Sequence, residues 1–405
     1  MASVQSVDRG FFPLDEELEL LPGVLTPHGH ESLVRLAGWM PFEQAAEIFA
    51  DLMQIKIDPS LCRRYTEEAG GIYEKMQDEE VDQLEKKMPD APAAGSEKMQ
   101  ISADGAMVPL LHGKWEEVRT LVVGEVQPAR LEKGEWVVHT RNLSYFSRKI
   151  TAQAFDRLAL VEIQRRGVEN ASQVVAIMDG ADWEQGFIDH HCPNATRILD
   201  FPHAGEHISP IGEFLLGEST PEMKLWTTQH LHQLKHEGPI PLINEIRELQ
   251  KQNPEAQVIS ANLAYLEKRE KHMQYPQFQA QGWPIGSGIV ESGNKLVVEA
   301  RLKGSGMHWA DGHVNSMLAI RNIICSDRWK EDWPKIADQL RKKNADKRHR
   351  LFLSRKNRDK PKPPVPFIIL PRTPLDPIIP QKKDNPWKKF KFGHALFQRP
   401  DPAKK

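Results

Sequence analysis

The chain has 405 residues, of which 40% are hydrophobic and 27% charged, and its formal net charge is -2. These proportions are ordinary for a soluble globular protein large enough to bury a sizeable core. No apolar run approaches the ~18–20 residues that span a bilayer, and the first residues lack the basic and apolar regions of a signal peptide. The cysteines are odd in number and far apart, so they imply no disulfide framework (Cys62, Cys192, Cys325). We therefore expect a reduced, cytosolic protein with no membrane partner.

The near-neutral net charge conceals an asymmetry. From Arg341 onward there are 20 Lys and Arg against 5 Asp, whereas the first 340 residues hold 34 basic and 51 acidic residues. A basic tail on an acidic body indicates a polyanion partner reached through the tail, and the alternative is a solvated end without a partner. We assign residues 335–405 to this tail, with a basic helix to about Arg350. The 11 prolines between Pro361 and Pro402 predict an extended conformation for the rest.

Residues 1–27 form an acidic N-terminal segment, and residues 28–88 are expected to be helical. Helices are predicted over Gly29–Gly38 and Phe42–Gln54, the second with a clear apolar stripe. Asp58 and Pro59 supply an N-cap and a first-turn proline for a third helix, which is expected to end near Ala69 at Gly70-Gly71.

The second and third of these helices have the layout of a helix-turn-helix. Arg63 and Arg64 lie near the start of the third helix, where they are candidates for DNA contact. Many helical hairpins share this layout, so plain packing is the alternative. The Pro- and Ala-rich segment 89–96 is a predicted linker.

Beyond the linker the hydrophobic pattern changes from helical spacing to strands. Three strands with short links predict an antiparallel meander, and a helix, a strand, a helix and a strand follow. The expected order is thus βββαβαβ, a mixed α/β sheet with helices packed on it. The predicted strands are Met99–Ala103, Val118–Val126, Trp136–Thr140, Val174–Met178 and Thr196–Leu199, and the two helices are Ala152–Arg166 and Asp182–His191.

From Ala204 to about Gln274 apolar residues recur only at helical spacing, which predicts an all-helical insertion, assigned to residues 208–280. A glycine-rich turn over 281–288 then leads into a helix over Ile289–Leu302 that carries Glu291. Another helix follows from about Ala310 to Cys325.

Three acids are candidates for one site. Asp104 and Asp179 each end a predicted strand, and Glu291 lies near the start of a helix after a sharp turn. Three carboxylates brought together suit two Mg²⁺ ions, for which Mn²⁺ is a possible substitute, because Mg²⁺ prefers hard oxygen ligands. Two such ions can stabilise the attacking and leaving oxygens of a phosphodiester displacement. The alternative is structural: Asp-Gly is a common turn, and Glu in a first helical turn complements the helix dipole.

Two further groups contain histidine. Asp200 and His203 could be an outer pair that steadies the site, or Asp200 could simply cap the helix that begins near Ala204. The His190-His191-Cys192 run has the residue types of a metal site. It lacks a Cys-x-x-Cys or a matching partner, so we interpret it as surface or packing residues.

The order of these motifs resembles a known family. Asp104-Gly105, Asp179-Gly180-Ala181, Asp200-Phe-Pro-His203 and the segment from Pro284 through Glu291 to Lys295 resemble bacterial insertion-sequence transposases of the DDE type. The ISKra group, related to Mutator-like elements, is the most similar. The resemblance spans roughly residues 27–333, and the Glu291 segment with the following Gly304–Trp309 is its most specific part.

The resemblance implies a ribonuclease-H-like catalytic core in two parts, residues 97–207 and 281–334, separated by the helical insertion. It also implies that Asp104, Asp179 and Glu291 are the catalytic acids and bind two divalent ions. Asp200 and His203 match a signature of the Mutator-like relatives. Lys295 and Arg301 follow Glu291 along its helix and are candidates for phosphate contact, with a solvated helix face as the alternative.

We therefore expect a DNA transposase that nicks its element ends and joins the 3′-hydroxyl ends to target DNA. Its partners would be double-stranded DNA and further copies of itself, and it would be bacterial and nucleoid-associated when on DNA. Two alternatives stay open: a two-metal nuclease of the same fold without strand transfer, and a domesticated DNA-binding protein that no longer catalyses.

Overall fold

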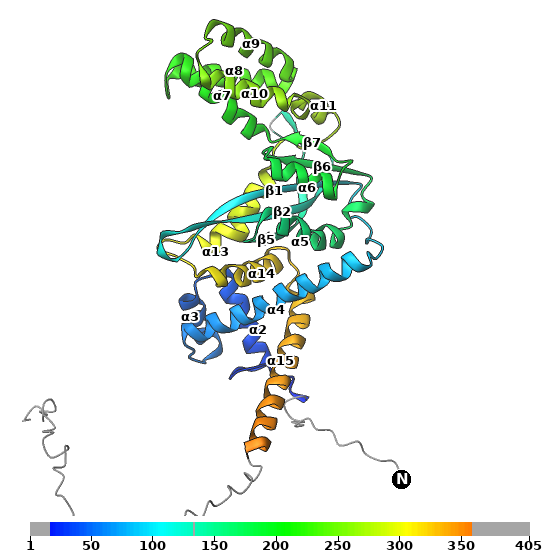
Figure 1. Cartoon of the computed structure of the whole chain (residues 1–405), viewed down its shortest axis with the longest axis vertical. Helices are drawn as coiled ribbons and strands as arrows, with labels where there is room; N and C mark the ends of the chain where they lie inside the picture. Colours follow the sequence, from blue (N-terminus) through cyan, green and yellow to red (C-terminus); the bar gives the residue numbers. More distant parts are fainter. Residues whose placement is uncertain (1–16, 133, 359–405) are drawn as a thin grey trace, which may run out of the picture. The chain divides into compact units, whose positions relative to one another are not determined.

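The candidate site is built on a five-stranded mixed sheet. The computed structural model describes residues 17–132 and 134–358, and the sheet has the strand order β5-β2-β1-β6-β7 (Figure 1). Strands β1, β2 and β5 pair antiparallel, while β6 pairs parallel to β1 and β7 parallel to β6. The bounds are Lys98–Pro109 (β1), Trp115–Val126 (β2), Thr140–Arg148 (β5), Gln173–Met178 (β6) and Thr196–Leu199 (β7). The chain is thus a mixed α/β protein with many helices around one sheet.

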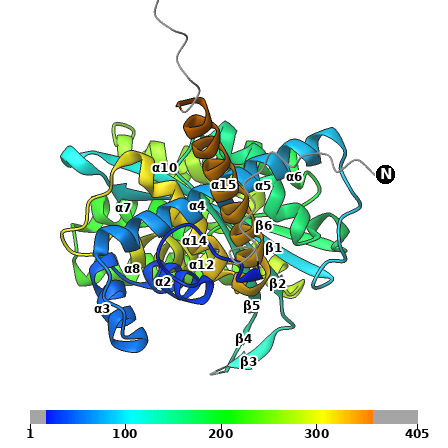
Figure 2. The same ribbon diagram turned by 90° about the horizontal axis from the view of Figure 1, so that it is seen from below.

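Two of the predicted strands were placed wrongly. The first strand does not end at Asp104, because Asp104 and Gly105 both stay in the β1–β2 ladder, opposite Thr120 and Arg119. The third strand of the sheet is β5 and not Trp136–Thr140. Trp136 belongs to a separate hairpin of β3 (Arg130–Glu132) and β4 (Glu135–Val137), where its side chain is 70% exposed (Figure 2). The apolar run at Trp136 predicts a core strand, but it forms an exposed hairpin strand. In β5 the buried residues include Ser144, Ser147 and Arg148, so its sequence has no clear apolar pattern.

The two faces of the sheet are covered by different helices. Helices α5 and α6 and the last turns of α4 pack on Met99, Ile101 and Ala103, which share one face of β1. Helices α12, α13 and α14 and the π-helical segment η4 pack on the other face, against Ala106 and Val108. Because side chains alternate along a strand, Asp104 lies on this second face. The bounds are Pro59–Lys86 (α4), Ala152–Arg165 (α5), Asp182–His191 (α6), Gly288–Gly293 (α12), Asn294–Glu299 (η4), Ala300–Leu302 (α13) and Val314–Cys325 (α14).

From Phe201 to Ala280 the chain forms helices joined by short turns, with no strand, as its apolar spacing predicts. This stretch packs around its own hydrophobic cluster, which also takes in Val175, Ile177 and Leu199 from the edge of the sheet. Its helices are α7 (Phe201–Leu216), α8 (Pro221–Glu237), α9 (Pro239–Gln252), α10 (Gln257–Lys268), η3 (Glu270–Met273) and α11 (Tyr275–Ala280).

The N-terminal helices share a hydrophobic cluster with α14 and α15. The predicted break at Gly70-Gly71 is wrong, since α4 continues through both residues as one helix (Figure 1). The reason is packing: a Cβ on Gly70 would lie 1.9 Å from the carbonyl oxygen of Ser316 in α14. Gly70 therefore lets two helix backbones approach closely instead of ending one of them. The remaining bounds are Pro27–Trp39 (α2), Phe42–Met53 (α3), Leu111–Gly113 (η1), Val168–Asn170 (η2), Asp311–His313 (η5) and Trp329–Arg358 (α15).

The chain divides into two compact units, Met1–Phe352 and Leu353–Lys405, and the site lies in the first. The predicted basic helix near Arg350 is the end of α15, which continues to Arg358. The proline-rich part of the tail from residue 359, and residues 1–16 of the acidic N-terminal segment, lie outside the described residues. None of the described helices is long and apolar enough to cross a membrane.

Candidate active site

Asp104 lies in the central strand β1 and is partly buried. Its Oδ1 accepts a hydrogen bond of 2.6 Å from the amide of Gly105, and its Oδ2 accepts one of 2.9 Å from Nδ2 of Asn294. Burial raises the pKa of the Asp104 carboxyl, and the charge of Asp179 raises it further. The sheet therefore brings the first two predicted acids close enough to repel each other.

Asp179 follows β6, which runs beside β1. Its Oδ1 accepts a 2.9 Å hydrogen bond from the amide of Ala181, and its carbonyl accepts one of 2.6 Å from the hydroxyl of Tyr265 in α10. Gly180 has a φ of +87°, and a Cβ there would lie 2.5 Å from Nε of Arg269. Asp179 and Gly180 therefore form the predicted turn, and Tyr265 and Arg269 of the helical insertion pack against it.

Glu184 is a third acid at this point, and it is not among the acids predicted from the sequence motifs. It lies in the first turn of α6, is 1% exposed, and its Oε2 accepts hydrogen bonds from the amides of Gly180 (3.1 Å) and Ala181 (3.3 Å). Burial raises the pKa of the Glu184 carboxyl to about 10, and its hydrogen bond with Asp179 and the charge of Asp179 add to this. The sequence does contain a clue to this role. Glu184 is the third residue of the predicted helix that begins at Asp182, a position where glutamate commonly bonds the free backbone amides at the helix start.

Glu291 lies in the short helix α12. Its side chain is 66% exposed and forms an ion pair of 2.6 Å with Nζ of Lys295. Asn294, on the same helical stretch, is the residue that reaches Asp104. Close packing holds this stretch on the sheet, since a Cβ on Gly293 would lie 2.8 Å from Val122. The structure therefore brings the Glu291 helix to Asp104 through Asn294, while the Glu291 carboxylate itself contacts Lys295.

The three predicted acids do not form a tight ligand cluster. Within the described residues, only one group of at least three His, Cys, Asp or Glu side chains has ligand atoms within 4.8 Å of one another, and it is Asp156, His190 and His191. Asp104, Asp179 and Glu184 still supply the hard oxygen donors that Mg²⁺ prefers. The raised pKa values of Asp104 and Glu184 mark an environment whose charge repulsion a divalent cation would relieve.

Asp200 links the helical insertion to the turn before Glu291. Its Oδ2 accepts a 3.1 Å hydrogen bond from the amide of His203, as a helix N-cap, and its Oδ1 accepts one of 2.6 Å from the amide of Ser287. The predicted carboxylate–imidazole pair is not formed, because the His203 imidazole lies 3.0 Å from Glu206. The capping alternative is therefore the one observed, and the cap also positions the start of α12.

Arg301 does not lie on an exposed helix face. It is 2% exposed, its Nε donates to the carbonyl of Ala37, and its guanidinium lies over the rings of Phe42 (4.7 Å) and Trp309 (5.2 Å). The π-helical geometry of η4 intervenes between Glu291 and Arg301, so a regular helical wheel places Arg301 wrongly. A phosphate contact from this buried side chain is contradicted, whereas Lys295 is 65% exposed.

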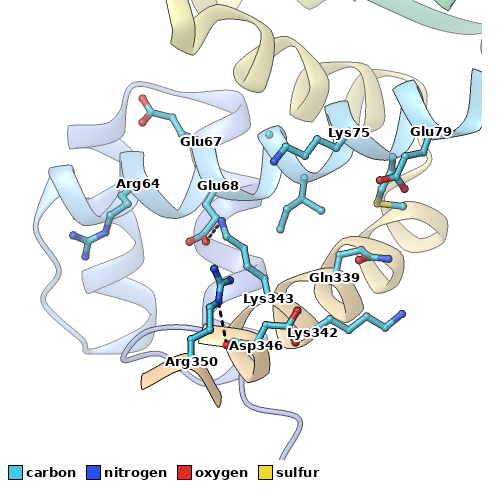
Figure 3. Close-up of a pocket in the computed structure, with 13 residues that line it drawn as sticks. Arg64, Glu67, Glu68, Lys75, Glu79, Gln339, Lys342, Lys343, Asp346 and Arg350 are labelled. Atoms are coloured by element: carbon cyan, nitrogen blue, oxygen red, sulfur yellow. Dashed lines mark hydrogen bonds and ion pairs between the residues drawn. The ribbon is translucent and has the colours of Figure 1, made fainter. Parts of the chain in front are cut away.

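Arg63 and Arg64 are on the N-terminal part of α4. Arg63 is 52% exposed and lies 3.9 Å from Glu67. Arg64 lines a groove between α4 and α15 (Figure 3), which has a volume of about 580 Å³. The groove is of mixed charge: Glu67, Glu68, Glu79 and Asp346 stand among Arg64, Lys75, Lys342, Lys343 and Arg350, and Lys343 is paired with Glu68 at 2.7 Å. Its charge balance therefore does not single out phosphate as a ligand.

Comparison with known proteins gives a weak similarity. No family model matches the chain, and no curated protein matches it. A solved structure titled "Drosophila P element transposase strand transfer complex" is similar with a TM-score of 0.26 and 10% identity, over 78% of this chain and 82% of that chain. The class that the structure itself defines is a mixed α/β protein with two partly buried acids, one on the central strand β1 and one directly after β6.

Proposed function

We propose that the chain is a DNA transposase of the DDE type, as the ISKra-like motifs imply, with a ribonuclease-H-like core. The observation that carries the proposal is that Asp104 on β1 and Asp179, directly after the neighbouring strand β6, are close enough for their charges to interact, with Asn294 from the Glu291 stretch bonded to Asp104. The order β1-β2-β5-α5-β6-α6-β7, followed by a helical insertion and then α12, is the order expected for such a core.

Asp104 and Asp179 would hold two Mg²⁺ ions, with Glu291 as the third ligand from α12. The bound ions would stabilise charge on the attacking and leaving oxygens of a phosphodiester. Asn294 fixes the Asp104 carboxylate, and the Ala181 amide fixes that of Asp179. Since the exposed Glu291 side chain already reaches Lys295, its approach to the metals would exchange that ion pair for metal ligation.

DNA would lie against the exposed side of α12, where Lys295 is available for phosphate once Glu291 leaves it. The acidic body disfavours DNA elsewhere, so binding would depend on local cations such as Arg63 and Arg64 and on the basic tail. The helix-turn-helix role of α3 and α4 is part of this proposal.

The experiment is an end-cleavage and strand-joining assay with Mg²⁺ or Mn²⁺, on DNA that carries the inverted repeats flanking the gene. Metal-dependent joined products that disappear in Glu291→Gln are expected. Glu299→Gln is the matched control, because Glu299 forms the same kind of i,i+4 pair with Lys303 (2.7 Å) along the same helical stretch. Cleavage without joining would favour a nuclease of the same fold, and binding without cleavage would favour a non-catalytic DNA-binding protein.

A further inference from the structure

Asp156, His190 and His191 meet where the start of α5 approaches the end of α6. Nδ1 of His190 lies 2.7 Å from Oδ2 of Asp156. Nε2 of His191 lies 3.1 Å from Oδ1 and is hydrogen-bonded to the backbone carbonyl oxygen of Asp156 at 2.8 Å. No sequence motif predicts a partner for the two histidines, and the fold brings Asp156 beside both of them. Their ligand atoms all lie within 4.8 Å of one another.

The distances are close to those between ligands of one zinc ion. Zinc bonds of about 2.0–2.1 Å in tetrahedral geometry place neighbouring ligand atoms about 3.3 Å apart. The two imidazole–carboxylate separations, 2.7 Å to Oδ2 and 3.1 Å to Oδ1, are shorter than this, and a bound ion would replace the hydrogen bond from His191 to the Asp156 carbonyl. Oδ1 of Asp156 is also buried without a hydrogen-bond partner among the described residues, which leaves an acceptor with spare capacity.

The local charge favours a cation. The histidines are in the last turn of α6, where the helix dipole presents its negative end. No Lys or Arg in the described part of the chain forms an ion pair with Asp156.

The exposure of the ligands fits a site at the surface. The His191 side chain is 2% exposed and held by the fold, whereas that of His190 is 60% exposed. An ion held by these three groups would have its fourth position open to water. Two imidazoles also favour ions of the zinc type over Mg²⁺, which prefers oxygen ligands.

We propose that Asp156, His190 and His191 bind one divalent transition-metal ion of the zinc type, which clips α5 to α6. The site is separate from the acids of the proposed active site, since Asp179 precedes the beginning of α6 and the histidines are at its end. Its ion would be structural: by joining two helices it would stabilise the packing of α6, whose first turn carries Glu184. The inference does not depend on the proposed transposase function.

The test uses the full chain, freed of metal with a chelator and titrated with Zn²⁺ in competition with a chromophoric chelator. One equivalent is expected to bind and to raise the thermal unfolding temperature, because a ligand specific to the folded state stabilises it. His190→Gln and Asp156→Asn are expected to weaken Zn²⁺ binding by roughly tenfold or more and to abolish the thermal shift. His190→Gln changes an exposed residue, so it decides the result if Asp156→Asn does not fold.

Three control variants separate this site from others. His139→Gln removes an exposed histidine that also has a carboxylate partner, Glu132 at 2.8 Å, but no second histidine. His232→Gln removes the ring contact with His236 on α8, and Asp179→Asn alters the proposed active site. All three should bind Zn²⁺ like the wild type. The inference is overturned if no Zn²⁺ binds, if His190→Gln binds normally, or if the tight equivalent is lost in His232→Gln or Asp179→Asn.

Discussion

Nδ2 of Asn294 donates a 2.9 Å hydrogen bond to Oδ2 of Asp104, across 190 positions of sequence. The bond joins the helical stretch that carries Glu291 to the central strand of the sheet. It fixes the rotamer of a partly buried carboxylate that the proposed chemistry requires in one orientation. Asn294 is 5% exposed and so has little freedom to point elsewhere.

We expect Asn294→Ala to lower end cleavage by roughly tenfold, since a hydrogen bond to a charged group contributes about 1.5–3 kcal/mol. DNA binding should change little, because Asn294 is buried. The measurement is the single-turnover cleavage rate beside a gel-shift affinity. Asn262→Ala on α10 is the control, and an unchanged cleavage rate in Asn294→Ala would remove this bond from the mechanism.

Asp104→Asn and Asp179→Asn should each lower cleavage by roughly 100-fold or more. Each change removes a charged oxygen ligand, and metal stabilisation of the transition state amounts to several kcal/mol. Gel-shift affinity for the element ends should stay within about twofold. Wild-type rates in either variant would exclude that residue from the site.

Gly70 and Gly71 form a matched pair for testing the packing of α4 on α14. A Cβ on Gly70 would lie 1.9 Å from the Ser316 carbonyl oxygen, whereas one on Gly71 would lie 3.6 Å from the Ser316 hydroxyl. Gly70→Ala should therefore lower the free energy of unfolding by about 3 kcal/mol through overpacking. Gly71→Ala should be neutral or raise it by up to about 1 kcal/mol, because alanine favours a helix. Urea unfolding measures both, and equal effects would contradict this packing.

His30 makes stability depend on pH. The ring is 1% exposed and stacked on Tyr65 at 4.3 Å, and burial lowers the pKa of His30 from 6.5 to about 4, against a small opposing effect of Glu68. Between these two values the unfolded state takes up a proton that the folded state does not, so stability falls as pH falls from about 6.5 to about 4. The loss is on the order of 3 kcal/mol at 1.36 kcal/mol per pKa unit.

The measurement for His30 is the free energy of unfolding at pH 7.5 and pH 5 in the wild type and in His30→Leu. The variant should lose part of the pH dependence. His28→Leu, at an exposed position two residues earlier, should keep all of it. A His30→Leu curve that parallels the wild type would place the titration elsewhere.

Local sequence predicted most of the elements. Apolar spacing gave the mixed α/β class, the helical stretch between β7 and α12 and the buried strand before Asp179, because amphipathic periodicity is set by the face that each element buries. Apolar spacing gave wrong predictions where a residue's structure depends on contacts with residues distant in the sequence. Gly70 was interpreted as a helix break, although its role is set by the backbone of Ser316, and Trp136 was assigned to the sheet although it lies in a separate hairpin.

The sequence by itself determined which residues have the chemistry: the acids Asp104, Asp179 and Glu291, and the two adjacent histidines. Only the tertiary structure decided which of them meet. It brought Asp104 and Asp179 together with Glu184, set Glu291 beside Lys295, buried Arg301 and gave His190 and His191 a carboxylate. The physical reason is that spacing along a chain fixes only neighbours within a turn or a strand. Contacts between distant residues depend on how the sheet and its helices pack.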